Sequence, residues 1–72
     1  YDDINKAYHY NQGSIEVIDF IMAHKMDFNQ GNVIKYVSRY KYKNGVPDLE
    51  KAMYYLKKLI KQAKEEQIDI TD

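Results

Sequence analysis

The absence of cysteine leaves this chain of 72 residues few ways to stabilise a folded state. A domain of this length buries a limited fraction of its surface, and it usually relies on disulfides, a structural metal or oligomerisation. Disulfides and thiolate zinc sites are excluded here, and the two histidines do not complete a structural zinc site on their own. We therefore expect residues 1–72 to form one helical domain that assembles into a homo-oligomer.

The hydropathy of the sequence indicates whether the protein spans a membrane or is secreted. No apolar run approaches the roughly 20 residues that span a membrane, and no signal peptide is recognisable. The sequence therefore predicts a soluble, intracellular protein that has no membrane partner.

The formal net charge is zero, but the charge is unevenly distributed along the chain. Residues 1–27 carry about −3, residues 28–64 carry +7, and residues 65–72 carry −4. A basic block of this kind suits a phosphate-bearing ligand, whereas the neutral total argues against general nucleic-acid binding. The alternative is that the acidic ends fold back against the basic middle, within a subunit or between subunits.

Apolar residues at 3–4 spacing predict helices over residues 14–25, 30–43 and 47–64. Ser14 is the expected N-cap of the first helix, and Pro47 suits the first position of the third. An ordered Tyr-rich arm (residues 1–13) would precede the helices, and an acidic tail (residues 65–72) would follow them. Short connections between helices favour an all-α, three-helix hairpin bundle.

The second and third predicted helices each carry a stripe of apolar residues that we expect to face a core. In the second helix the stripe is Val33, Ile34, Val37 and Tyr40. In the third helix it is Leu49, Ala52, Met53, Leu56, Leu59, Ile60 and Ala63.

The start of the second predicted helix is the strongest candidate binding site. Gly31 and Asn32 precede the basic residues, so the backbone could approach a ligand and offer free N–H groups to an anion. Lys35 and Arg39 follow one and two turns later and would hold further phosphate oxygens. Tyr36 lies beside them and could stack on a base. The alternative is a solvated basic face with a tyrosine at its margin.

The remaining candidates are weaker. His9 and Tyr10 could contact a phosphate or base, or they could pack in an aromatic cluster. Glu16 and Asp19 could hold part of a magnesium shell, although a second acidic pair is missing and Glu16 could instead pair with a base of the second helix. No P-loop and no nucleophile–base–acid arrangement is present, so no catalytic or metal-binding residue is assigned.

Three segments together resemble a short phage family often called SaV-like, a domain of unknown function. The segments are HYNQGSIEVIDFI, MDFNQGNVIKYVSRYKYKNG and DLEKAMYYLKKLI, and they span about residues 9–60. One longer phage member is a nucleoside monophosphate kinase that lacks a P-loop. The resemblance implies nucleotide binding in the cytoplasm of an infected bacterium. Carried onto this chain, its pattern adds four possible supporting residues to the site: Glu16, Asp48, Lys51 and Tyr55.

Three functions compete on this basis. The first is a nucleotide-binding oligomer that holds its ligand at subunit boundaries without chemistry, sequestering an immune signal such as a cyclic oligonucleotide or an ADP-ribose derivative. The second is a nucleoside monophosphate kinase, which alone would need magnesium as a cofactor. The third is a module that binds DNA or a host factor. We expect the first.

Overall fold

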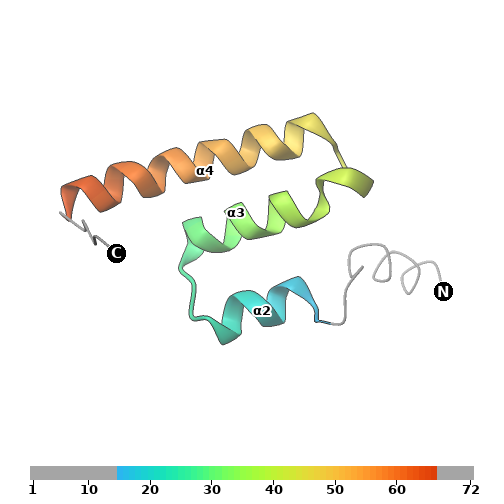
Figure 1. Cartoon of the computed structure of the whole chain (residues 1–72), viewed down its shortest axis with the longest axis horizontal. Coiled ribbons are helices and arrows are strands. Elements are labelled where there is room, and N and C mark those ends of the chain that lie inside the picture. The colour runs from blue at the N-terminus through green and yellow to red at the C-terminus, as the bar shows by residue number, and fades with distance from the viewer. Residues whose placement is uncertain (1–14, 67–72) are drawn as a thin grey trace, which may run out of the picture.

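The computed structural model describes residues 15–66, which form three α-helices and no strand (Figure 1). Helix α2 spans Val17–Ala23, α3 spans Phe28–Arg39, and α4 spans Val46–Glu65. A short 3-10 helix, η1 (Tyr40–Tyr42), extends α3 before the chain reverses. The predicted small all-α domain of three helices is thus confirmed over this part of the chain. None of these helices is both long and apolar enough to cross a membrane.

Several expectations concern residues outside the described range. These are the N-terminal arm with His9 and Tyr10, the N-cap at Ser14, and residues 67–72 of the acidic tail.

Helix α2 is shorter than expected at both ends. It follows Glu16, whose side chain makes no capping bond, and it stops at Ala23. Lys25 then takes a left-handed conformation with φ of 54°. Its N–H donates to the Met22 carbonyl at 3.0 Å, and the Met26 N–H donates to the Ile21 carbonyl at 3.1 Å. This pair of bonds is a Schellman motif, in which glycine is the usual left-handed residue.

A tight turn joins α3 to α4. The Gly45 N–H donates to the Tyr40 carbonyl at 2.8 Å, and Gly45 adopts φ of 67° and ψ of −133°. This backbone conformation is open almost only to glycine. Helix α4 starts at the next residue, so Pro47 occupies its second position rather than the first.

The three helices lie side by side, with α2 and α4 on opposite sides of α3 (Figure 1). Helix α4 runs antiparallel to α3 and continues beyond it. These helices form one layer, and within residues 15–66 no further element covers either face of it.

The single layer overturns much of the expected core. Within residues 15–66, Ala52 is the one hydrophobic residue that is fully buried. The exposed residues include five that were expected to face the core: Val37, Leu49, Met53, Leu56 and Ile60. Their spacing correctly indicated helices, but within residues 15–66 a row of three helices provides no second layer to cover these side chains.

Candidate functional site

Helix α3 begins with a capping box that sequence reasoning missed. The Asp27 carboxylate accepts a bond from the Gln30 N–H at 2.8 Å, and the Gln30 side-chain oxygen accepts one from the Asp27 N–H at 3.0 Å. The pattern of an acidic residue followed three positions later by Gln is visible in the sequence and could have placed this start.

This start corrects the reason for assigning Gly31 to a phosphate site. Gly31 is the fourth residue of α3, and its N–H already donates to the Asp27 carbonyl at 2.9 Å. A carboxylate also caps the helix, so its positive end faces a negative group of the protein itself. The expected cradle of free N–H groups at Gly31 and Asn32 is therefore wrong.

Gly31 instead permits α2 to approach α3 closely. A Cβ atom added at this position would lie 3.1 Å from Cγ2 of Ile21 and 3.8 Å from its Cδ1. The absent side chain thus sets the spacing of the two helices, and with it the shape of the groove between them.

A groove of about 630 Å³ lies between α2 and α3. Its apolar lining comes from both helices and from the turn that joins them. That lining consists of Val17, Ile18, Ile21, Met22, Met26 and Phe28. Charged and polar groups complete it, namely Glu16, Asp27, Asn32, Lys35 and Arg39. The groove therefore offers apolar surface next to both cations and acceptors.

Asn32 is the most informative polar group of the groove. The residue is 8% exposed, and its Nδ2 atom has no hydrogen-bond partner within residues 15–66. Buried amide groups are normally paired, because an unpaired donor loses its bonds to water without replacement. Asn32 thus presents an unused donor at the wall of a groove.

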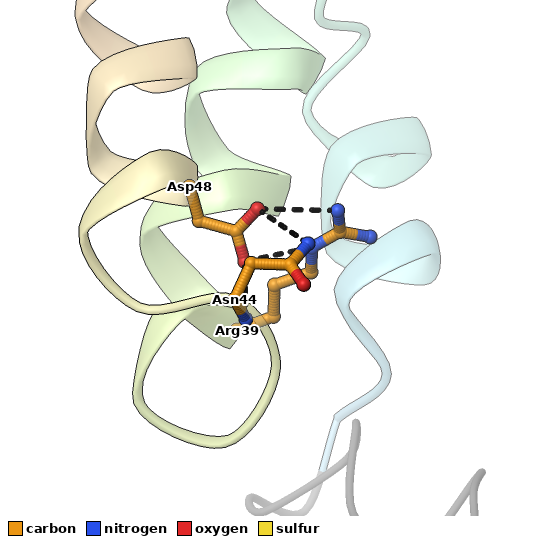
Figure 2. Close-up of polar contacts among 3 residues, drawn as sticks. All are labelled: Arg39, Asn44 and Asp48. Carbon is orange, nitrogen blue, oxygen red and sulfur yellow. Dashed lines mark hydrogen bonds and ion pairs between the residues drawn. The ribbon is translucent and has the colours of Figure 1, made fainter.

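Arg39 is held by the protein itself. Its Nε donates to Oδ2 of Asp48, and its Nη2 donates to Oδ1, both at 3.2 Å (Figure 2). Asn44 adds two donors to the same carboxylate at 3.3 Å, from its backbone N–H and its Nδ2. Figure 2 shows the three side chains converging where the α3–α4 turn closes.

Asp48 is fully buried in this network. Burial acts to raise the pKa of its carboxyl group. The hydrogen bonds from Arg39 and Asn44, together with the Arg39 charge, outweigh that effect and hold the pKa below its usual range. Asp48 was expected only as a supporting ligand residue, whereas here it ties the end of α3 to the start of α4.

Tyr36 lies at the centre of an aromatic and cationic cluster beside the groove. Its ring stacks on that of Tyr55 with centroids 6.0 Å apart and planes 10° apart. Three cations surround the ring, with Lys35 Nζ at 4.6 Å, Arg39 Cζ at 4.8 Å and Lys51 Nζ at 5.5 Å from its centroid. Within residues 15–66, neither lysine forms an ion pair.

The structure thus divides the predicted site residues. Five of them line the groove: Glu16, Gly31, Asn32, Lys35 and Arg39. Three more join them through the cluster around Tyr36: Tyr36 itself, Lys51 and Tyr55. Gly31 serves helix packing and Asp48 serves the turn. Glu16 forms no ion pair within the described residues, so the alternative in which it pairs with a base of the second helix is not seen.

Sequence reasoning missed the apolar part of the groove and the role of Asn44. Met26 and Phe28 carry no chemical signal of their own, because a methionine or phenylalanine beside a helix start is ordinary. Within residues 15–66, no three acidic, histidine or cysteine residues gather closely enough to hold a metal ion.

Fold and groove together define a small all-α domain with a partly apolar cleft between its first two described helices. The chain belongs to the family described as "Protein of unknown function (DUF3310)", whose sequence profile matches residues 4–57. No curated protein and no solved structure matches it.

Proposed function

We propose that this protein binds a nucleotide in the groove between α2 and α3. The base and sugar lie along the apolar lining, and the phosphate lies toward Lys35, Lys51 and the outer edge of Arg39. The observation that carries the proposal is the convergence of these three cations on Tyr36, beside a groove that holds an unpaired amide.

The arrangement of charges around Tyr36 supports the proposed position of the phosphate group. Three like charges within 6 Å of one ring centroid repel one another, so an anion placed among them is favoured. Asp48 already neutralises Arg39 on one edge through Nε and Nη2. The uncommitted charge is therefore that of Lys35 and Lys51, which is suited to one or two phosphate groups.

The lining of the groove supports the proposed position of the nucleotide base. Ligand sites combine a mostly apolar wall with a few fixed polar groups that orient the ligand. The Asn32 Nδ2 is a donor with nothing to bind, and a ring nitrogen or carbonyl of a base is an acceptor of suitable size.

We propose further that the nucleotide is held and not converted. No nucleophile, base and acid converge in the sequence, which favours storage or sequestration over transfer. Through the phage resemblance of the sequence, the ligand would be a nucleotide immune signal, a cyclic oligonucleotide or an ADP-ribose derivative.

Calorimetry against cyclic dinucleotides, ADP-ribose derivatives and deoxynucleoside monophosphates tests the proposal. We expect at least one ligand to bind in the micromolar range or tighter. Lys35→Ala and Lys51→Ala should each weaken binding roughly tenfold, and Asn32→Leu should weaken it with a change of base preference. Lys41→Ala is the matched control, because this exposed lysine lies outside the groove and the cluster.

Two outcomes would count against parts of the proposal. The absence of binding across the whole panel at millimolar ligand would remove nucleotide binding. Release of ADP from ATP, magnesium and any nucleoside monophosphate would replace sequestration with the kinase function, and Lys35→Ala would then abolish the turnover.

A further inference from the structure

An exposed apolar stripe runs along α4, away from the groove. Its residues recur at steps of three and four, the spacing at which helices pack in coiled coils and four-helix bundles. Their exposure ranges from 38 to 64%. The stripe consists of Val46, Leu49, Met53, Leu56 and Ile60.

The stripe lies on one face of the helical layer. At about 100° per residue, its centre lies roughly 100° around α4 from the positions of Asp48 and Ala52, which are buried toward α3. Adjacent helices of a four-helix bundle meet a shared helix at a similar angle. The stripe can thus accept another helix while α3 stays in place.

The opposite face of the layer carries the candidate ligand site. Lys51 projects from α4 on the side away from the stripe, and, like Lys35 of α3, it lies over the Tyr36 ring. Val37 lies on the side of α3 away from Lys35, so it shares the face of the stripe and is itself exposed. The layer therefore carries the cations and the ligand groove on one face and the α4 stripe on the other.

We propose that the apolar face binds a second copy of this chain, with the two α4 helices antiparallel. A two-fold axis near residues 54 and 55 sets Met53 against Leu56 of the partner subunit, and Leu49 against Ile60 of the partner subunit. The two α3–α4 hairpins then form a four-helix bundle. Helix α3 contributes Val37 beside the stripe, and the ligand groove stays open on the outer face.

Charge complementarity indicates which molecule binds the stripe and in which direction the two α4 helices run. Glu50 and Lys57 flank the stripe on its edge away from α3, and neither forms an ion pair within residues 15–66. In the antiparallel arrangement Glu50 lies opposite Lys57 of the partner subunit, and symmetry makes this contact twice. Parallel pairing would place the two copies of Glu50, and the two copies of Lys57, on opposite sides of the contact, so neither side chain would meet an opposite charge of the partner. The stripe is thus complementary to itself in one orientation.

Sedimentation equilibrium between about 1 and 100 µM tests the dimer. We expect twice the chain mass. Met53→Glu should raise the dissociation constant at least about 100-fold, because symmetry places two carboxylates in the contact. Tyr54→Glu is the matched control, since Tyr54 and Met53 are both 56% exposed but Tyr54 lies off the stripe. Retained helicity by circular dichroism would show that Met53→Glu remains folded. A monomeric wild type, or a dimer insensitive to Met53→Glu, overturns the proposal.

Charge reversal tests the orientation without altering the apolar contact. Glu50→Lys and Lys57→Glu should each weaken the dimer, and the double variant should restore it. Because the chain has no native cysteine, mixing Leu49→Cys with Ile60→Cys chains gives a second test that does not depend on stability. Oxidation should yield the mixed disulfide ahead of either symmetric one. Preferential formation of the symmetric Leu49→Cys disulfide, or failure of the double reversal to restore the dimer, overturns the antiparallel arrangement.

Discussion

Replacing Gly31 by alanine sets two opposing effects against each other. In a helix interior, the change from glycine to alanine raises the free energy of unfolding by about 1 kcal/mol, because the backbone loses less conformational freedom on folding. The new Cβ, however, would lie 3.1 Å from Cγ2 of Ile21, whereas carbon atoms prefer a separation of about 3.5–4.0 Å. Helix α2 must move by a few tenths of an ångström, so we expect most of the gain to disappear.

A double-mutant cycle with Ile21→Ala separates these effects. Ile21→Ala removes both atoms that meet the added Cβ, so Gly31→Ala should gain the full ~1 kcal/mol in that background. In the wild-type background the gain should fall to roughly 0–0.5 kcal/mol, which gives a coupling of about 0.5–1 kcal/mol. Urea denaturation followed by circular dichroism at one fixed protein concentration measures all four variants.

Gly45→Ala is the control for this cycle. A Cβ at Gly45 meets nothing within 4 Å, but the positive φ is strained for any residue with a side chain. We expect a loss of about 1–3 kcal/mol that is the same with or without Ile21→Ala. If Gly31→Ala gains equally in both backgrounds, to within about 0.3 kcal/mol, the close approach of α2 and α3 is not the role of Gly31.

Three further predictions concern the helix ends and the turn. Lys25→Gly should stabilise by about 1 kcal/mol, measured as a higher urea midpoint, because it relieves the left-handed conformation that ends α2. Asp27→Ala should lower the free energy of unfolding by about 1 kcal/mol because α3 loses its cap, whereas Asp27→Ser should retain most of the capping stabilisation. Equal losses in the two variants would exclude the capping role. The lowered pKa of Asp48 means that its stabilising effect is complete above the pKa of the unfolded chain. Wild-type urea midpoints should therefore fall as the pH drops below about 4, and Asp48→Asn should have a lower midpoint near neutral pH and a smaller acid dependence.

Local sequence signals predicted the secondary structure because they act within a few residues. Apolar spacing indicated three helices, and Asn44-Gly45 marked the turn between the last two. Where the predicted boundaries differ, a local signal was overlooked or unusual. The Asp27 and Gln30 pair was readable as a capping box, whereas a lysine in the left-handed position of a Schellman motif could not be anticipated from residue preference.

Packing was harder to predict because it depends on how the helices meet. The stripe of α4 is equally consistent with a core and with a contact between subunits, and a sequence pattern contains no information that separates the two. Asp48 was expected only as a supporting residue of the ligand site. Its burial against Arg39, nine residues earlier, follows only from the tight reversal at Gly45.

The Arg39–Asp48 pair also decides which residue can test the ligand site. Removing Arg39 would weaken ligand binding, but it would also leave a fully buried carboxylate without its charged partner. Such a change destabilises the fold, so lost binding in Arg39→Ala would not distinguish a contact with the ligand from a displaced turn. Lys35 has no such second role, because it is exposed and lies outside the Asp48 network. The charge of Lys35 is therefore the decisive probe of nucleotide binding, and Arg39 is informative only when binding and stability are measured on the same variant.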